Sequence, residues 1–192
     1  MPGLVVLAGA NANDSKGLLK AAVRSNDPVV FLESELLYNM TFPLSEEAQR
    51  SDYVLPIGKA NIEVEGSDVT LVSFSRQVNN CIEAAKILAA QGIKAEVINL
   101  RSIRPLDTGC LVKSLQKTHR MVTVEEGWPQ FGVGSEIAAQ MMEHAFDYLD
   151  APIERITGAD VPMPYDKNLE DVAMVQVHNI VNAAQRVLYK KK

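Results

Sequence analysis

The sequence has little cysteine, few aromatic residues and no long apolar run. Its only cysteines, Cys81 and Cys110, lie far apart, and each falls within a helical pattern. The cysteines lack the short spacing of zinc ligands, and a disulfide between them is not expected, so we predict two buried thiols in a reducing compartment. No apolar run reaches the about 20 residues of a membrane-spanning helix, so we expect no membrane partner.

Positive charge is also scarce. Against 24 acidic residues the chain has 19 lysines and arginines, a formal net charge of −5, and its only basic cluster is Lys190–Lys192. Proteins that bind nucleic acids need a basic surface that follows the phosphates, so we predict no nucleic-acid partner. The histidines His119, His144 and His178 stand singly, without the paired spacing of a metal site.

The motifs of several enzyme classes are absent. Neither GxGxxG after a strand nor GxxxxGK[ST] occurs, and Gly132-Val-Gly134 is only a fragment of such a loop, so the sequence does not predict nucleotide binding. Ser75, Ser102 and Ser135 lack the GxSxG context of a nucleophile elbow. A serine hydrolase therefore has little support.

What the sequence does contain is a regular alternation of apolar strands and amphipathic helices. Hydrophobic residues make up 47% of the 192, enough for one sizeable core or two small ones. The alternation predicts an α/β fold of three layers, a mostly parallel sheet with helices on both faces. The expected strands are 4–8, 29–32, 60–64, 69–74, 95–100, 121–124 and 153–156. The expected helices begin near Asn13, Ser75, Asp107, Ser135 and Val175.

Local patterns add detail to these elements. The continuous apolar run at 29–32 favours a strand covered on both faces. The short turn between 60–64 and 69–74 predicts a hairpin or a neighbouring pair of strands. Residues 101–107 and 159–170 are expected to be loops, and Gly92 to end a helix. Asn13 or Asp14 is expected to cap the first helix, and its inward positions are Leu18, Leu19, Ala22 and Val23.

The composition divides the chain into two units. Residues 39–55 are polar and irregular, as is typical of a linker, so we expect units at 1–38 and 56–192. A strand pattern follows Met1-Pro-Gly3 directly, which is typical of a chain that begins partway through a fold.

The segment Thr123–Ile137 joins a strand to a helix through a turn rich in glycine and proline. It places Glu125 and Glu126 at the carboxyl end of a strand, where open sheets usually bind ligands. One interpretation makes these acids general acid–base residues. The favoured interpretation is structural, with the acids capping the turn or pairing with arginines such as Arg101 and Arg104.

Asp150 is a second candidate. It lies between an exposed-looking segment, Asp147–Leu149, and the dipeptide Ala151-Pro152. A basic residue of a partner protein could form a charge-assisted hydrogen bond with its carboxylate. The alternative, stabilisation of a turn before proline, is equally compatible with the sequence.

Several segments together resemble one family, the beta subunits of the pyruvate dehydrogenase decarboxylase component, with the mitochondrial form most similar. The matching segments are Glu33–Tyr38, Leu55–Ala60, Glu96–Asp107, Val122–Gly134, Tyr148–Pro152 and Ile156–Tyr165. The resemblance implies a transketolase-type C-terminal domain at 56–192, preceded at 1–38 by a remnant of the pyrimidine-binding domain. It implies a thiamine diphosphate enzyme built from two alpha and two beta chains, located in the mitochondrial matrix or, alternatively, in a bacterial cytoplasm.

The resemblance implies two sites and no catalytic residue. The activating glutamate and a histidine loop of the family match no part of this chain. The aspartate that faces the dihydrolipoyl acetyltransferase core corresponds to Asp150. A potassium site corresponds to Ala22, Val23, Ser25 and Asp27, where Ser25 replaces an acid and Asp27 an amide, and a further ligand has no counterpart here.

The expected partners are therefore the alpha subunit, a second beta subunit and the acetyltransferase core. The predicted role of this chain is assembly and docking within oxidative decarboxylation of pyruvate, with no activity alone. Two alternatives remain: a free-standing module that binds the core, and the beta subunit of a branched-chain 2-oxoacid dehydrogenase.

Overall fold

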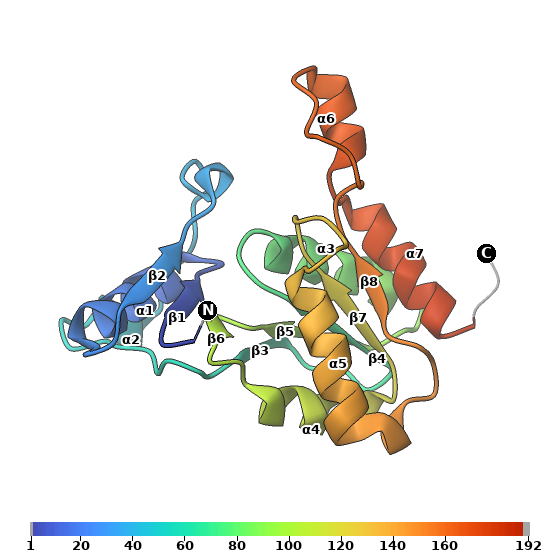
Figure 1. Ribbon diagram of the computed structural model, residues 1–192, viewed down its shortest axis with the longest axis horizontal. Helices are drawn as coiled ribbons and strands as arrows, with labels where there is room; N and C mark the ends of the chain where they lie inside the picture. Colours follow the sequence, from blue (N-terminus) through green and yellow to red (C-terminus); the bar gives the residue numbers. More distant parts are fainter. Residues whose placement is uncertain (1, 190–192) are drawn as a thin grey trace.

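The computed structural model describes residues 2–189 and contains two sheets (Figure 1). A five-stranded sheet has the order β3-β5-β4-β7-β8, and a three-stranded sheet has the order β2-β1-β6. The strands are β1 (Val5–Ala8), β2 (Val29–Leu32), β3 (Asn61–Val64), β4 (Val69–Ser73), β5 (Ala95–Asn99), β6 (Ser102–Arg104), β7 (Met121–Val124) and β8 (Glu154–Ile156). The helices are α1 (Ala12–Arg24), α2 (Glu46–Gln49), α3 (Gln77–Ala90), α4 (Thr108–Thr118), α5 (Val133–Ala145), α6 (Lys167–Ala173) and α7 (Val177–Val187), with 3₁₀ turns η1 (Glu35–Leu37) and η2 (Phe146–Tyr148).

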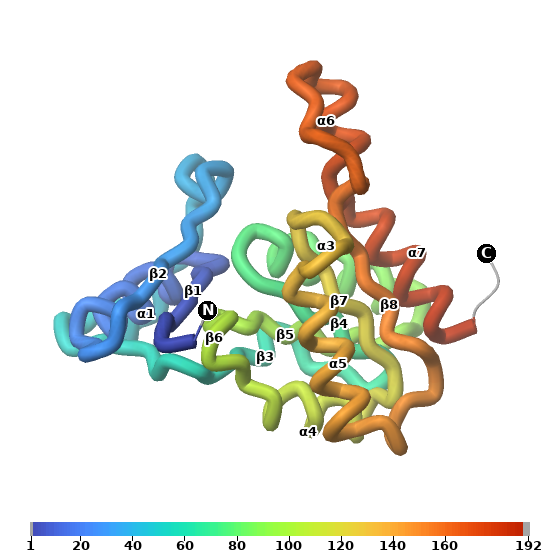
Figure 2. Tube along the Cα trace, in the orientation of Figure 1, coloured from blue at the N-terminus to red at the C-terminus, as the bar shows by residue number. Residues whose placement is uncertain are grey.

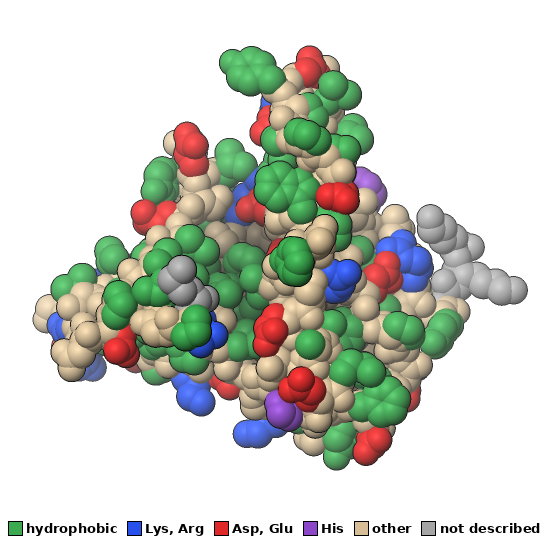
Figure 3. Space-filling model, viewed as in Figure 1, with side chains coloured by type: hydrophobic (Ala, Val, Ile, Leu, Met, Phe, Trp, Pro, Cys, Tyr) green, Lys and Arg blue, Asp and Glu red, His purple; other side chains and the backbone are tan. Residues whose placement is uncertain are grey.

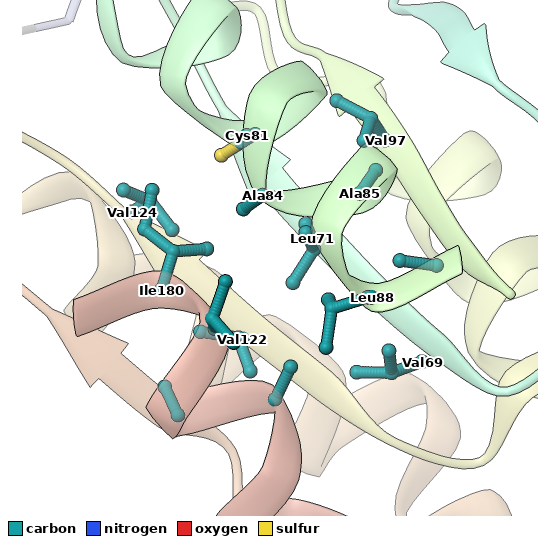
Figure 4. Packing of buried hydrophobic residues seen from close by; sticks show 14 of the residues in the cluster. Val69, Leu71, Cys81, Ala84, Ala85, Leu88, Val97, Val122, Val124 and Ile180 are labelled. Carbon is teal, nitrogen blue, oxygen red and sulfur yellow. The ribbon is translucent and has the colours of Figure 1, made fainter. Parts of the chain in front are cut away.

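The larger sheet has the three-layer arrangement that the sequence predicts. Strands β5, β4, β7 and β8 run parallel, and β3 joins the edge antiparallel. Helices α3 and α7 pack on one face, where Leu71, Leu88, Val122 and Ile180 meet in a dry core (Figure 4). Helices α4 and α5 pack on the other face around a second core. Because both faces are covered, β4, β5 and β7 are buried along their whole length, including the polar residues Thr70, Glu96 and Asn99.

The smaller sheet joins the beginning of the chain to its middle. Strand β1 pairs parallel with β2 and antiparallel with β6. Strand β6 lies in the segment 101–107, for which the sequence predicts a loop, so that prediction is wrong. Three residues are too few to display an alternating pattern, and the strand forms because Arg101, at φ +57°, turns the chain toward β1.

The expected pairing of residues 60–64 with 69–74 is also wrong. Strand β3 pairs with β5, which lies between β3 and β4. The connection crosses the beginning of β5, since the backbone N–H groups of Ser67 and Asp68 both donate to the carbonyl of Lys94 at 3.0 Å. Gly66 permits this crossing, because a Cβ there would lie 2.3 Å from the Ala95 carbonyl carbon.

The N-terminal unit is less covered than the sequence predicts. Strand β2 is an edge strand with its side chains alternately half-buried and exposed, so the expectation of cover on both faces is wrong. On α1, Leu18 is buried as expected, but Leu19 and Val23 are exposed, Val23 at 81%. Within residues 2–189, no other element buries the side of α1 that carries Leu19 and Val23.

Some helix boundaries differ from those expected. Asn11, earlier in the chain than the expected cap, caps α1, with its Oδ1 accepting from the Asp14 N–H at 2.9 Å. Ser75, at φ +53°, precedes α3 without capping it. Asp166 caps α6, a helix that begins inside the expected loop 159–170 and continues to Ala173. The caps expected from Asp107 and Gly92 are confirmed, since Asp107 accepts from the Cys110 N–H and Gly92 has φ +76°.

Two segments stand away from the sheets. The tube in Figure 2 shows α6 at the tip of a long arm, and the segment after β2 rising on the same side of the molecule. The segment 39–55 packs along α1, where the Leu55 N–H donates to the Gly17 carbonyl at 3.2 Å. No helix within residues 2–189 is long and apolar enough to cross a bilayer.

Candidate functional site

Asp150 is held by its neighbours at three points. Its backbone N–H donates to the His119 carbonyl at 2.9 Å, and its carbonyl accepts from the Tyr189 hydroxyl at 3.3 Å. Its carboxylate Oδ2 lies 3.4 Å from Nη2 of Arg120. The side chain is nevertheless 53% exposed, so a fixed backbone presents a carboxylate to solvent.

An apolar hollow of about 420 Å³ lies beside this carboxylate. We call it the Asp150 hollow; it is lined by Ala138, Met142, Phe146, Leu149, Asp150, Ala151, Pro152 and Ile153. The end of α5 and the turn η2 expose Met142 at 54% and Phe146 at 59%. Figure 3 shows hydrophobic and acidic side chains gathered near this lower end of α5. An apolar floor beside one ordered charge is the composition of a protein-docking site.

Glu125 is a structural residue. It is 4% exposed, and its carboxylate accepts from the N–H groups of Val133 at 3.0 Å and Gly134 at 2.9 Å, at the N-terminus of α5. The positive end of the helix dipole and two unpaired donors stabilise a carboxylate there. Gly132 and Gly134 leave the necessary space, since a Cβ at Gly132 would lie 2.4 Å from Glu125 Oε1. The favoured interpretation of this acid as a cap is confirmed.

Glu126 is also engaged by its neighbours. Its Oε1 lies 3.1 Å from Nη1 of Arg76 and accepts from Nε2 of Gln77 at 3.3 Å. Pairing with an arginine was expected and is confirmed, but the partner is Arg76 and not Arg101, which pairs with Asp14. Both strand-end acids therefore have structural partners within the chain.

The residues of the potassium prediction share one turn at the end of α1. The Ser25 N–H donates to the Ala22 carbonyl, and the Asp27 N–H donates to Ser25 Oγ, both at 3.1 Å. The carbonyls of Ala22 and Val23 lie at the negative end of the helix. Asp27 is exposed and adds a carboxylate to this oxygen-only set. Such donors suit a hard cation. Among residues 2–189, no cluster of three or more histidine, cysteine or acidic side chains could hold a metal.

Sequence reasoning missed Arg120, Tyr189 and the hollow itself. Arg120 precedes β7 and lies 30 positions before Asp150, so no local pattern joins them. The signal in the sequence was the spacing of two apolar residues four positions apart, Met142 in α5 and Phe146 at the start of η2, both of which are exposed.

Comparisons with known proteins agree with this architecture. The family model described as "Transketolase, C-terminal domain" matches residues 58–180. The mitochondrial pyruvate dehydrogenase E1 component subunit beta of Dictyostelium discoideum is 65% identical over 192 residues, which cover all of this chain and 54% of that protein. The corresponding protein of Mus musculus is 54% identical over 188 residues, which cover 97% of this chain and 52% of that protein. The chain thus spans about half the length of the curated relatives it matches.

Solved structures share the fold. A chain described as "Split gene transketolase, inactive beta4 tetramer" has a TM-score of 0.79 at 26% identity, over all of this chain and 59% of that one. A transketolase from Pichia stipitis has a TM-score of 0.61 at 17% identity, over 98% of this chain and 25% of that one. At that identity, the second likeness shows the fold alone.

Proposed function

The chain belongs to the transketolase C-terminal domain family, and we propose that it is part of the beta subunit of a mitochondrial pyruvate dehydrogenase E1 component. The high identity with E1 beta subunits over the full chain supports this assignment over a branched-chain enzyme. The whole enzyme would decarboxylate pyruvate and transfer acetyl to lipoyl-lysine in the mitochondrial matrix. Thiamine diphosphate would supply the carbanion-stabilising chemistry of that reaction.

The role we propose for this chain within the enzyme is assembly and docking. Its strand-end acids are engaged by α5 and by Arg76, so none of its described residues receives a catalytic role. The split-gene transketolase that shares its fold is described as an inactive tetramer of beta chains, which fits a chain that needs a partner subunit for activity. An alpha subunit and a second beta subunit are the proposed assembly partners.

The observation that carries the proposal is the Asp150 hollow. Its ordered carboxylate, beside exposed Met142 and Phe146, suits a small domain that presents a basic residue next to an apolar one. We assign this partner as the subunit-binding domain of the dihydrolipoyl acetyltransferase core. A free-standing module that binds the core would use the same surface, and differs only in lacking the alpha subunit as a partner.

Calorimetric titration of the chain with the isolated subunit-binding domain tests this site. Asp150→Ala should weaken binding by about 1–3 kcal/mol, because it removes a charge-assisted hydrogen bond. Asp147→Ala is the matched control, since Asp147 is exposed and close in sequence but does not line the hollow. An unchanged affinity for Asp150→Ala, or an equal loss for both variants, rejects the docking site.

The turn after α1 is the proposed potassium site. The backbone carbonyls of Ala22 and Val23, together with Ser25 and Asp27, supply oxygen donors of the appropriate kind. A bound cation would stabilise the end of α1 next to β2, and thus the surface that the N-terminal unit offers to other chains.

A further inference from the structure

We infer that Arg120 is a positioning residue for the docking carboxylate: it holds one oxygen of Asp150 so that the other faces the partner's cation. This inference rests on the proposed docking function of the Asp150 hollow.

The Arg120 guanidinium is fixed by a hydrogen bond of its own, separate from its contact with Asp150. Its Nε donates to the Val187 carbonyl at 3.1 Å, at the C-terminal end of α7. A guanidinium is planar and rigid, so this bond also fixes the direction of Nη2, which lies 3.4 Å from Asp150 Oδ2. The Arg120 side chain is 25% exposed against 53% for Asp150, so the carboxylate is the more accessible of the two charges.

The backbone on both sides is fixed as well. His119 ends α4 in the left-handed conformation, at φ +59°, and its carbonyl accepts the Asp150 N–H. The Arg120 carbonyl accepts from the Thr118 hydroxyl at 3.1 Å. The arginine and the aspartate are therefore both attached to the turn between α4 and β7. Their separation depends on this turn and on α7, two parts of the same domain.

The Asp150 carboxylate has acceptor positions that Arg120 does not use. An ionised carboxylate has two oxygens that can accept about four hydrogen bonds. Arg120 faces Oδ2, and within residues 2–189 no donor to Oδ1 is present. Oδ1 is thus available to one arginine or lysine of the partner, whose apolar neighbour would enter the Asp150 hollow.

Arg120 has two opposing effects on binding. Its positive charge weakens the long-range attraction of a basic partner, which lowers the association rate. Its ion pair with Asp150 restricts the rotamers of that side chain before binding. Less conformational entropy is then lost in the complex, so dissociation is slower. Salt separates the two effects, because screening shortens the range of exposed charges from about 10 Å at 0.1 M to about 3 Å at 1 M, and so weakens the long-range effect of Arg120 more than its contact with Asp150 at 3.4 Å.

The test is a kinetic double-mutant cycle with the isolated subunit-binding domain immobilised and the full chain in solution, in 0.15 M and 0.5 M NaCl. At the higher salt, Arg120→Ala should dissociate roughly three- to tenfold faster than the unaltered chain, since a freed side chain must be ordered on binding. Arg120→Lys should recover only part of this loss, because lysine has no planar group that donates to the Val187 carbonyl and at the same time holds a second nitrogen beside Asp150. In an Asp150→Ala background, Arg120→Ala should leave the dissociation rate unchanged.

Arg50→Ala controls for the lost charge, because Arg50 is exposed and pairs with Asp52 far from the hollow. Urea unfolding of each variant verifies the fold. The positioning role is overturned, and the docking site stands, if Asp150→Ala weakens binding but Arg120→Ala does not change the dissociation rate. The same holds if Arg120→Ala changes the dissociation rate equally in the unaltered chain and in the Asp150→Ala variant. If Asp150→Ala itself has no effect, the docking site is wrong and the positioning role falls with it.

Discussion

The Asp14 carboxylate lies 2.7 Å from Nε of Arg101 and is completely buried. It also accepts from the Ala10 N–H at 3.1 Å and from Nδ2 of Asn99 at 2.7 Å. Asp14 belongs to α1, whereas Asn99 and Arg101 lie at the end of β5 in the larger domain. This one carboxylate therefore joins the N-terminal unit to the domain that carries the docking surface.

We predict that Asp14→Ala destabilises the chain by about 3–5 kcal/mol, because it leaves Arg101, whose side chain is only 15% exposed, without its counter-charge. Urea unfolding at pH 7 measures the change. Asp52→Ala, which removes an exposed partner of Arg50, should leave the unfolding midpoint nearly unchanged. Equal midpoints for the unaltered chain and Asp14→Ala would contradict the joining role.

The glycines beneath Glu125 should not tolerate a side chain. A Cβ at Gly134 would lie 2.4 Å from Thr123 Oγ1 and 3.0 Å from Glu125 Oε1, both on buried residues. Gly134→Ala must therefore displace the cap of α5, and we predict a loss of about 2–4 kcal/mol from overpacking and the lost carboxylate bonds. Thermal unfolding followed by circular dichroism measures it.

Gly109 provides the matched substitution for that experiment. It lies in the first turn of α4, and the nearest atom to its Cβ position is Asp107 Oδ1 at 3.8 Å. Gly109→Ala should be neutral or stabilise the chain by about 0.5–1 kcal/mol, because alanine loses less backbone entropy in a helix. If both alanine variants unfold alike, the Gly134 contacts do not matter for stability.

The two cysteines should differ in reactivity. Burial raises the pKa of the Cys81 thiol to about 12, and burial also raises the pKa of Cys110, which is only half-buried. We predict that iodoacetamide at pH 8 modifies Cys110 first and Cys81 only when the chain unfolds, which peptide mass spectrometry can follow. Modification of Cys81 at the rate of Cys110 would contradict the buried core.

Ionisation of the Cys81 thiol should lower the free energy of unfolding at alkaline pH. The pKa of Cys81 is higher in the folded chain than its ordinary value of 9.0. The contribution of the protonated Cys81 thiol to the free energy of unfolding is therefore complete below about pH 9 and is lost as the pH rises toward 12. Unfolding free energies should therefore fall across this range, and fall less steeply in Cys81→Ala. Parallel declines for the two proteins would contradict the assignment.

Potassium should stabilise the chain more than sodium does. Replacing 0.1 M NaCl by KCl should raise the unfolding temperature by roughly 3–10 °C, if this concentration exceeds the dissociation constant tenfold to a hundredfold. Asp27→Ala should abolish the difference, and Asp52→Ala should preserve it. Identical transitions in both salts would remove the site from this chain.

The sequence predicts what depends on local pattern. The strands β4, β5 and β7 were expected from their sequence patterns, as were α7 and the helix that follows Asp107. The pairing of β3 with β5 was not predictable, because it depends on the close crossing at Gly66 over Ala95. Arg120 was missed for a similar reason: residues 30 positions apart acquire their relation only through the turn after α4 and the end of α7.

The measurement that tests the central claim most directly is release of carbon dioxide from carboxyl-labelled pyruvate by the purified, folded chain, with thiamine diphosphate and magnesium supplied. A docking and assembly part whose acids are engaged in helix capping and ion pairing should release none above background, and a complete E1 component assayed in parallel should turn over. Sustained, thiamine-dependent release by this chain alone would contradict the division between a docking surface here and the bond-breaking chemistry in other parts of the enzyme.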